Sequence, residues 1–506
     1  MGTTVQSIIS AGSEGLIVDI ECHLSNNLPN IVIVGSASKA VDESRERIRG
    51  AFATSHIILP RKRITVNLAP ADIPKADSGF DLAIAVAILI ASGQLPAKPD
   101  KHQAFIGELG LDGSTRAVRG IIGKLLAGRA RGIDTFYIPD ANLEQAQLVP
   151  KVKLVPITSL RQLYECFSAG QPLRTIATGF GRYRSPAETV KTGVQLSEVV
   201  GQHQAKRALE IAAGGGHNVL FDGPPGTGKS MLAKAFKSIL PPLDREEALQ
   251  VTHLHSLAGH DYDKIITERP FRAPHHSASH IAIVGGGSTL RPGEISLAHR
   301  GVLFLDELPE FQRDSLEALR QPLEDHTINV ARAKETAEYP AGFILVATAN
   351  PCPCGYFGSD RKCDCTEYGR SQYRQKLSGP ILDRIDLYTP VHEIHHDKLL
   401  TQAANPAADA AIRQRVTKAR QRQARRYGRG GELNTDMTNA DIKRYCRLEP
   451  EAKQVLNDAA RRLKLSARAY MRSVKVARTI ADLEAATIIT AAHISEALVY
   501  RPSIYK

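Results

Sequence analysis

An eight-residue segment near the middle of the chain has the composition of a phosphate-binding loop. It reads GPPGTGKS, between the apolar stretch NVLFD and the helical stretch MLAKAFKSIL, the strand, loop and helix context that such a loop requires. Glycines let backbone N–H groups converge on phosphate oxygens, Lys229 adds a positive charge, and the Ser230 hydroxyl can bind Mg²⁺. The predicted nucleotide-binding residues are Gly223, Pro224, Pro225, Gly226, Thr227, Gly228, Lys229 and Ser230.

Two further apolar stretches end on polar residues that suit phosphate chemistry. GVLFLDE ends on Asp306, which can hold Mg²⁺, and on Glu307, which can orient or deprotonate a water. FILVATAN ends on Asn350, whose amide can polarise the attacking water. Because ligands of an open α/β sheet bind beyond the carboxyl ends of its strands, we expect three strands to deliver these residues to one crevice.

Four of the seven cysteines are crowded into fourteen positions directly after Asn350 and Pro351. They are Cys352, Cys354, Cys363 and Cys365, in the pattern C-x-C, eight residues, C-x-C. In a reducing compartment such a cluster favours metal binding over disulfides, and four thiolates satisfy tetrahedral Zn²⁺. We expect a small structural zinc loop, with four reduced surface thiols as the alternative. The two adjacent histidines elsewhere in the chain, His275 and His276, are not expected to bind metal.

The charge balance suits a polyanionic partner. The 506 residues include 65 Lys plus Arg against 53 Asp plus Glu, a net charge of +12, which fits nucleic acid, nucleotide or anionic lipid. The longest apolar run, residues 82–91, is about half the length of a bilayer span, and the N-terminus has no basic-then-apolar signal. The sequence therefore predicts a cytoplasmic protein without a membrane partner.

The composition along the chain predicts an α/β protein with several domains. Alternating apolar runs mixed with helical patterns indicate an α+β domain at the N-terminus, followed by a linker rich in Gly, Ser, Thr and Pro. A large α/β core, a basic helix stopped by glycines and a helical lid come next. The predicted boundaries are 1–167 for the first domain, 168–195 for the linker, 196–395 for the core, 396–430 for the basic connecting helix and 431–506 for the lid.

The phosphate loop and the polar strand ends together resemble an AAA+ ATPase. By that resemblance GPPGTGKS is Walker A, LFLDE is Walker B and Asn350 is sensor 1. The resemblance also makes Arg384, in SGPILDRIDL, the arginine finger, although an Arg between two acids is more often an ordinary ion pair. A finger that acts across a subunit boundary implies a ring. Arg468 resembles the sensor 2 arginine, with Arg472 and Arg478 nearby as alternatives.

Two insertions narrow the resemblance to one branch of this class. Residues 328–342 resemble a pre-sensor β-hairpin and residues 269–301 resemble a pore-facing insert. Segments such as FRAPHHSAS and GEISLAHRGVLFLDELPEF resemble the ComM/YifB-type, magnesium-chelatase-subunit-I-like bacterial AAA+ proteins, over nearly the whole chain. The resemblance implies a hexameric, ATP-driven DNA helicase or translocase that promotes branch migration during homologous recombination of incoming DNA in natural transformation. Single-stranded and branched DNA and the recombination machinery are the implied partners, with Arg332 and Lys334 of the hairpin as DNA contacts.

The N-terminal domain resembles the proteolytic domain of Lon, which has the ribosomal S5 domain 2-like fold. Lys124 stands where the lysine of a Ser-Lys pair would be, but the position of the nucleophile falls at Gly79 or Phe80, and Ser78 is slightly early. Because the hydroxyl must lie within hydrogen-bond reach of the amine, we expect the fold without the protease.

Two other functions remain as alternatives to the DNA motor. One is an AAA+ motor or chaperone that remodels a protein partner, as magnesium chelatase does with its metal-binding partner. The other is an ATP-dependent Lon-like protease, which would require Lys124. Stimulation of ATP hydrolysis by DNA, recovery of a protein partner, or cleavage of casein would distinguish the three.

Overall fold

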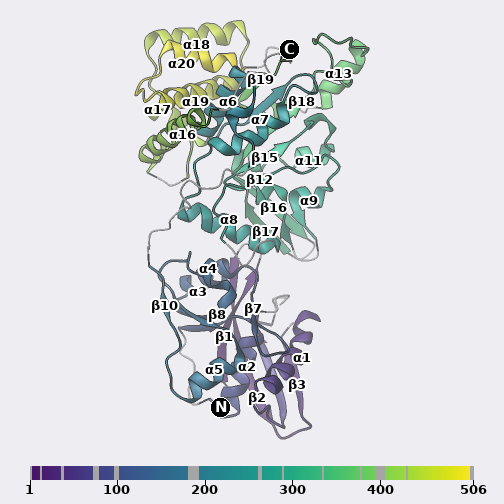
Figure 1. The fold of residues 1–506 in the computed structure, drawn as a ribbon, viewed down its shortest axis with the longest axis vertical. Coiled ribbons are helices and arrows are strands. Elements are labelled where there is room, and N and C mark those ends of the chain that lie inside the picture. The colour runs from purple at the N-terminus through teal and green to yellow at the C-terminus, as the bar shows by residue number, and fades with distance from the viewer. Residues whose placement is uncertain are drawn as a thin grey trace.

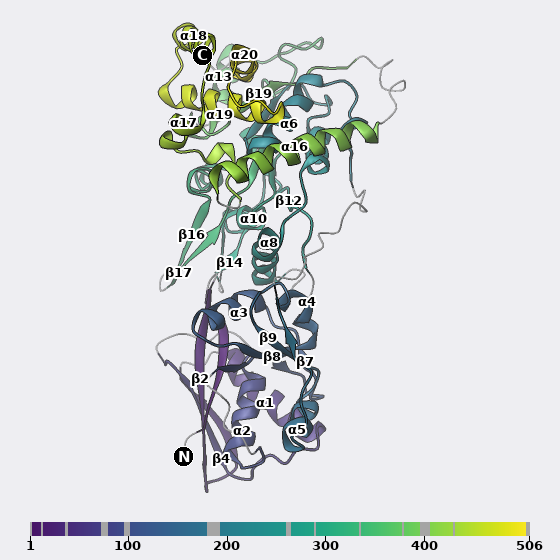
Figure 2. The ribbon, with the colours of Figure 1, turned by 90° about the vertical axis from the view of Figure 1, so that its left-hand side faces the viewer.

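The computed structural model describes residues 3–11, 14–35, 39–71, 79–95, 102–179, 193–259, 265–287, 290–332, 335–376, 379–394, 405–428 and 431–501. These residues form three regions along an elongated molecule (Figure 1 and Figure 2). The N-terminal domain (3–179) lies at one end. The α/β core (193–394) and the C-terminal helical region (405–501) lie together at the other.

The N-terminal domain contains two four-stranded sheets, ordered β1-β2-β4-β3 and β10-β9-β8-β5. Its elements are β1 (Thr3–Ala11), β2 (Glu14–Ser25), β3 (Asn30–Val34), α1 (Lys39–Thr54), β4 (Arg63–Ala69), α2 (Asp81–Ala91), β5 (Gln103–Phe105), β6 (Glu108–Leu109), β7 (Thr115–Arg116), α3 (Ile121–Ala130), β8 (Thr135–Pro139), α4 (Leu143–Ala146), β9 (Lys153–Ile157), α5 (Leu160–Ser168) and β10 (Ile176–Ala177). In helix α2 all residues from Asp81 to Leu89 are buried, as expected for a helix that is apolar almost all round. The apolar run that is too short for a bilayer is therefore a core helix.

The α/β core is built on a five-stranded sheet with the order β12-β15-β18-β11-β19, and its neighbouring strands pair in parallel. Every residue of β15 and β18 is buried, as expected for a parallel sheet covered on both faces. The elements are α6 (His203–Gly215), β11 (Val219–Asp222), α7 (Lys229–Ala235), α8 (Arg245–Ala258), β12 (Phe271–Arg272), α9 (His280–Val284), β13 (Gly285–Gly286), β14 (Arg291–Pro292), α10 (Glu294–Leu297), β15 (Val302–Leu305), α11 (Arg313–Glu317), α12 (Pro322–Asp325), β16 (Thr327–Arg332), β17 (Glu335–Pro340), β18 (Ile344–Ala349), α13 (Glu367–Lys376), α14 (Gly379–Leu382) and β19 (Leu387–Pro390). Because the strands are parallel, the carboxyl ends of β11, β15 and β18 meet at one edge.

The predicted hairpin over residues 328–342 is confirmed. Strands β16 and β17 pair antiparallel from Thr327–Pro340 to Arg332–Glu335. Both views show this hairpin on the side of the core that faces the N-terminal domain (Figure 1 and Figure 2). Of its predicted DNA contacts, Lys334 lies outside the described residues, and only the backbone of Arg332 is described.

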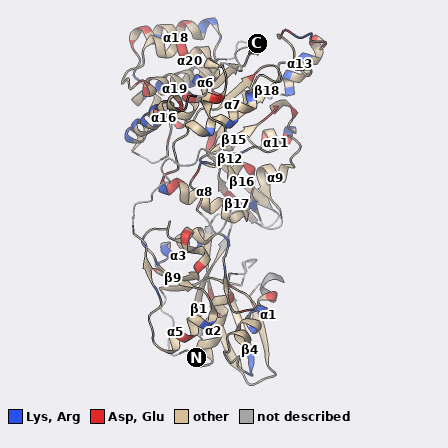
Figure 3. Cartoon of the chain, viewed as in Figure 1, with Lys and Arg blue, Asp and Glu red and all other residues tan. Residues whose placement is uncertain are grey.

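The predicted basic helix is also confirmed, as α16 (Pro406–Tyr427). Asn405 caps its start and Gly428, with φ 66°, ends it, and Figure 3 shows Lys and Arg along its length. The helix packs on α6, where Arg415 pairs with Glu210 at 2.7 Å. The helical region continues with α17 (Asn439–Tyr445), α18 (Pro450–Arg462), α19 (Ala467–Leu483) and α20 (Ala491–Val499).

The N-terminal domain contacts the core through α3 and α8. The backbone N–H of Gly120 donates to Ser256 Oγ at 2.7 Å. A Cβ atom added to Gly123 would lie 2.4 Å from the ring of His253, so the two helices touch where residue 123 has no side chain. The close approach therefore depends on a glycine in α3.

The α/β fold class with a C-terminal helical region is confirmed. The predicted linker begins within the N-terminal domain, since its residues 176–177 form β10, which pairs with β9. Residues 180–192 of the linker lie outside the described part, and the domain boundaries stay predictions. Across the described residues, the helices are too short or too polar to cross a bilayer.

Candidate nucleotide-binding site

The predicted phosphate loop connects β11 to α7. Gly228 begins α7 in the left-handed region, with φ 88°, which glycine adopts without strain. A Cβ atom on Gly223 would lie 2.1 Å from the backbone oxygen of Val391, the residue after β19. The first glycine is therefore required by the close approach of a neighbouring strand end, and the last by the turn into the helix.

Lys229 folds back over the loop and reaches a second strand. Its Nζ donates to Pro224 O and to Asn350 Oδ1, each at 2.9 Å, and also to Gly223 O. Burial lowers the pKa of Lys229, while the nearby carboxylate of Asp222 opposes that shift. The structure thus brings together Lys229 from the loop and Asn350 from the end of β18.

The two carboxylates of the predicted Walker B segment lie beside the loop. Both Asp306 and Glu307 are exposed at the end of β15. Ser230 Oγ donates to Asp306 Oδ2 at 2.9 Å. Hydroxyl and carboxylate oxygens are ligands that Mg²⁺ accepts in nucleotide sites. Ser230 and Asp306 therefore fit the metal role predicted for them, with Glu307 adjacent on the same turn.

Thr348 is a site residue that the sequence interpretation missed. Its Oγ1 donates to Asp306 Oδ1 at 2.6 Å and accepts from the backbone N–H of Glu307 at 2.8 Å. The side chain is fully buried. Glu307 has φ 52°, a left-handed conformation that is unusual for a residue with a side chain. Thr348 thereby fixes the turn that carries both carboxylates. In the sequence, the hydroxyl inside the otherwise apolar strand ILVATA is the feature that could have indicated this role.

The four clustered cysteines meet in space. Their Sγ atoms all lie within 4.8 Å of one another. Cys352 is 3.3 Å from Cys354 and 3.7 Å from Cys363, and Cys354 is 3.6 Å from Cys363. A zinc ion with four sulfur ligands at about 2.3 Å has sulfur–sulfur edges of about 3.8 Å. The cluster therefore fits a tetrahedral metal site, and it is the sole cluster of three or more such ligands that the described residues form.

One of these thiols is also electronically favoured as a ligand. The backbone N–H of Tyr356, followed by the Cys352 thiol, lowers the pKa of Cys354 to about 6. A thiolate is the form that binds metal. By contrast, the rings of His275 and His276 are tilted by 34° with centroids 4.1 Å apart, and His275 Nδ1 is bonded to Ser277.

The predicted arginine finger and sensor 2 arginine share one carboxylate. Arg384 Nη2 lies 2.8 Å from Glu324 Oε1, and Arg468 is bonded to the same oxygen. Although partial burial acts to raise the pKa of Glu324, the two arginines outweigh it, and the pKa is lowered. Glu324 follows from no motif in the sequence, because it lies 60 residues from one partner and 144 from the other.

This arginine cluster lies at the edge of the sheet opposite to the phosphate loop. Asn218 Nδ2 donates to the backbone oxygen of Arg384 at 2.9 Å, and Asn218 directly precedes β11, whereas the phosphate loop follows it. A four-residue strand rising about 3.3 Å per residue separates the two edges by more than about 10 Å. Neither Arg384 nor Arg468 is therefore placed against Lys229 of the same chain.

The two alternatives for sensor 2 have other partners. Arg472 Nε lies 3.7 Å from Asp386 Oδ1, close to the same cluster. Arg478 is 1% exposed and pairs with Asp482 at 3.0 Å inside the helical region. Arg478 is therefore a core residue, and Arg468 and Arg472 are the arginines of α19 that approach the cluster.

The N-terminal domain offers no hydroxyl at the positions where a protease nucleophile was expected. Gly79 has no side chain, and Phe80 is fully buried in the core below α2. Lys124 is also fully buried, in α3. Ser78 lies outside the described residues. The absence of proteolysis stays a prediction.

Three family models match the chain. The model described as "Magnesium chelatase, subunit ChlI" matches residues 195–399, "Subunit ChlI of Mg-chelatase" matches residues 20–142, and "Magnesium chelatase, subunit ChlI C-terminal" matches residues 407–501. Together with the parallel sheet and its phosphate loop, they define an ATPase of the AAA+ class. ATP and Mg²⁺ are the ligands that this class implies.

Two of the curated relatives described here extend over nearly the whole chain, and a third matches part of it. "Competence protein ComM" of Haemophilus influenzae is 42% identical over 502 residues, which cover 99% of this chain and 97% of the relative. "Uncharacterized protein YifB" of Escherichia coli is 41% identical over 488 residues, which cover 96% of this chain and 94% of the relative. The "Magnesium-chelatase 38 kDa subunit" of Rhodobacter capsulatus is 26% identical over 196 residues, which cover 35% of this chain and 56% of the relative. The chain belongs to the ComM/YifB family of magnesium-chelatase-subunit-I-like AAA+ ATPases.

Proposed function

We propose that this chain is an ATP-driven DNA translocase that works as a cytoplasmic hexameric ring. Its proposed role is to promote branch migration when incoming DNA is recombined during natural transformation, together with the recombination machinery. The 42% identity to a protein named for competence supports that role. The net charge of +12 supports a polyanionic partner.

The position of Arg384 and Arg468 is the observation that supports assembly into a ring. The pair is held by Glu324 at the edge of the sheet opposite to Lys229. Arginines stabilise the charge of phosphoryl transfer only when they touch the phosphate. A second copy must therefore present its own pair to the phosphate loop of the first, and repetition of that contact closes a ring.

The residues of one chain supply the rest of the ATP chemistry. The phosphate loop and Lys229 bind the phosphates, and Ser230 and Asp306 hold Mg²⁺. Glu307 orients or deprotonates the attacking water, and Asn350 polarises it. The hydrogen bonds that join Ser230 to Asp306 and Lys229 to Asn350 support this assignment.

The β16–β17 hairpin is the proposed DNA-contacting element. ATP turnover would move Arg332 and Lys334 along a phosphate backbone, with little dependence on base sequence. The hairpin starts directly after His326, which follows the short helix α12 that carries Glu324. The arginine cluster and the hairpin therefore belong to one continuous segment of chain.

Zinc is proposed as a structural ligand of Cys352, Cys354, Cys363 and Cys365. The fit of the sulfur positions to a tetrahedron supports zinc over four unrelated surface thiols. The ion would stiffen a loop that is too short to have a core of its own.

ATP hydrolysis measured with and without DNA tests the proposal. We expect single-stranded and forked DNA to stimulate the rate and to lose that effect as salt rises, because phosphate contacts release counterions. The Glu307→Gln variant should bind ATP and DNA without turnover, and wild-type protein should move the branch point of a labelled three-strand substrate. An ATPase rate indifferent to DNA at low salt would contradict the motor.

A motor acting on a protein partner is the second candidate. The similarity to a magnesium-chelatase subunit over 196 residues favours it. In that case a soluble protein recovered with the Glu307→Gln variant, and not DNA, would stimulate hydrolysis by the wild type. The same rate assay therefore separates the two functions.

A further inference from the structure

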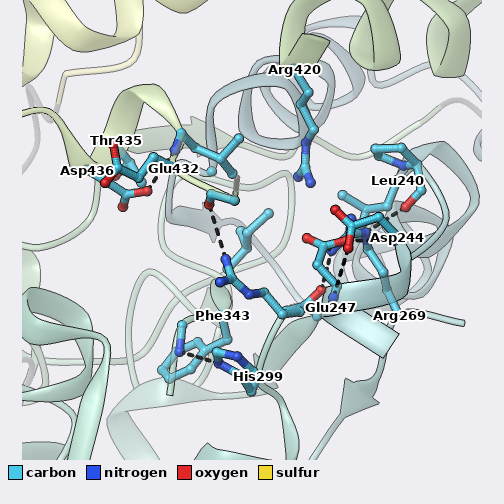
Figure 4. A pocket seen from close by; sticks show the side chains of 18 of the residues that line it. Leu240, Asp244, Glu247, Arg269, His299, Phe343, Arg420, Glu432, Thr435 and Asp436 are labelled. Carbon is cyan, nitrogen blue, oxygen red and sulfur yellow. Dashed lines mark hydrogen bonds and ion pairs between the residues drawn. The ribbon is translucent and has the colours of Figure 1, made fainter. Parts of the chain in front are cut away.

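A cavity of about 700 Å³ lies at the edge of the sheet opposite to the phosphate loop. Arg300 and Phe343, which line it, stand at the amino ends of β15 and β18. Helix α16 closes the cavity from the other side and contributes Arg420 (Figure 4). The cavity is thus a separate site, between the α/β core and the helix that leads into the C-terminal region.

Four acidic side chains line the cavity: Asp244, Glu247, Glu432 and Asp436. Glu247 pairs with Arg269 at 2.7 Å, and Asp436 pairs with His326 at 2.8 Å. Asp244 caps α8 by accepting from the backbone N–H of Glu247 at 2.8 Å. Each of these three therefore has a direct partner other than Arg420, and Glu247 and Asp436 also attract Arg420 at longer range.

The nitrogens of Arg269 are also committed. Besides the pair with Glu247, Nη1 donates to Arg300 O at 2.7 Å and Nε to Pro241 O at 2.6 Å. Arg269 is 7% exposed. It therefore builds the wall of the cavity and is not available to a ligand.

Arg420 differs from every one of these groups. Its Nε donates to Ala213 O at 2.7 Å, and within the described part of the chain its other two nitrogens have no partner. Figure 4 shows the guanidinium projecting from α16 into the middle of the cavity. Burial, followed by the positive charges of Arg269 and Arg300, lowers the pKa of Arg420 to about 9. The group still carries its charge at neutral pH, in a place where that charge is unfavourable.

A second guanidinium, that of Arg300, lines the same cavity. Arg300 donates from Nε to Gln250 at 3.1 Å and from Nη1 to Gly431 O at 3.1 Å, so its own acceptors are neutral. His299 adds no charge, because burial and Arg300 lower its pKa to about 3. Two arginines that line one cavity, neither paired with a described carboxylate, suit a ligand with two negative charges, and a phosphate monoester carries nearly that at neutral pH.

Part of the cavity wall is apolar. Leu240, Pro242, Phe343 and Leu433 line it, and its volume lies within the range of about 300 to 1,000 Å³ that is typical of small-molecule sites. We propose that this cavity binds a small organic phosphate, with Arg420 and Arg300 on the phosphate and the apolar wall on the organic part. Such a ligand would join α16 to the core at a place distinct from the ATP site.

Calorimetric titration with phenyl phosphate and with inorganic phosphate tests this site. The full-length protein would carry Lys229→Ala, so that the phosphate loop contributes less to the signal. We expect phenyl phosphate to bind more tightly than inorganic phosphate, because only phenyl phosphate uses the apolar wall. Arg420→Gln should weaken phenyl phosphate about ten-fold or more, the effect of losing a charge-assisted pair of hydrogen bonds.

Matched variants separate this site from general anion binding. Arg425→Gln removes the same charge from an exposed position of α16 and should leave the affinity unchanged. Arg300→Gln should reproduce the loss, and Arg420→Lys should retain part of the binding. Without ligand, Arg420→Gln should melt no lower than its parent, because the removed charge is repelled by Arg269 and Arg300 and forms no ion pair with a described carboxylate. Equal affinities in the Arg420→Gln and Arg425→Gln proteins, or no binding to the parent at low salt, would overturn the proposal.

Discussion

Gly355 of the four-cysteine loop lies directly against Pro225 of the phosphate loop. A Cβ atom on residue 355 would lie 2.8 Å from Pro225 Cδ, and the residue has φ 87°. A larger residue therefore cannot stand here unless one of the two loops moves. The cysteine loop supports the phosphate loop from outside, which links the four-cysteine cluster to the nucleotide site.

Gly355→Ala should weaken ATP binding about ten-fold, because overpacking at such a contact costs about 1–3 kcal/mol. Titration with a fluorescent ATP analogue measures the effect. Gly358→Ala is the matched control, since residue 358 lies in the same loop with φ 79° but has nothing within 4 Å of its added Cβ. Equal losses in both variants would assign the effect to backbone strain and not to the contact.

Metal analysis of the purified protein should give one Zn²⁺ for each chain. Cys354→Ser should lose the metal, lower the melting temperature and weaken ATP binding, because the loop that supports Pro225 is no longer held by zinc. Cys166→Ser, a free cysteine of α5 in the N-terminal domain, should change none of these. Full metal content in the Cys354→Ser protein would remove that residue from the proposed ligands.

Mixing two inactive variants should restore ATP hydrolysis. Lys229→Ala destroys the phosphate loop, and Arg384→Ala removes the finger but leaves ATP binding intact. In a randomly mixed ring about a quarter of the interfaces join an intact loop to an intact finger. A steady-state ATPase assay on the mixture checks this. As a control, the variant that carries both substitutions is mixed with each single variant, and the rate should not exceed that of the single variant alone. If the mixture of the two single variants stays inactive, the result contradicts a site at the interface.

Asp386 should make stability depend on pH. Burial acts to raise its pKa, but the His217 ring, whose Nδ1 lies 3.4 Å from Asp386 Oδ2, and the nearby Arg472 outweigh this and lower the pKa to about 2 from the ordinary 3.8. Because the folded-state pKa is depressed, the stabilisation is present above about pH 4 and is lost as the pH falls through about 2. Asp386→Asn should cost about 2 kcal/mol at pH 7, measured by denaturant unfolding, and progressively less toward pH 2. The exposed neighbour Asp383 provides the control, as Asp383→Asn should have little effect at either pH.

Thr348→Val should lower the rate of hydrolysis about ten-fold with a smaller change in ATP affinity, because Asp306 loses a hydrogen bond and the turn before Glu307 loses its anchor. Steady-state kinetics separate kcat from KM. Thr389→Val in β19 is the control: this threonine is also buried, and its Oγ1 has no hydrogen-bond partner within the described residues. We expect Thr389→Val to be neutral or stabilising.

Local patterns were sufficient for those parts of the site that a strand and its following turn determine. The phosphate loop, the Asp306 turn and Asn350 could be predicted together, because parallel strands place their carboxyl ends at one edge. The cysteine cluster could be predicted because its ligands lie within fourteen residues of one another. The rule for parallel strands carried the information in the first case, and the short separation along the chain carried it in the second.

Contacts between distant segments could not be predicted in this way. Glu324 meets Arg468 across 144 residues, and Gly355 meets Pro225 across two loops that no shared motif connects. Arg420 belongs to a helix whose sequence indicates only a basic surface, yet its charge lies against a cavity. These relationships depend on how the elements pack, which periodicity and spacing do not specify.

The contact between Gly123 and His253 has a mechanical consequence. A methyl group on Gly123 would meet the ring of His253 from α8, and Gly120 is bonded to Ser256 at the same seam. We expect a tilt of α8 to be passed through this seam to the N-terminal domain. Because the molecule is elongated (Figure 2), a small rotation at the seam would become a wide sweep at its far end.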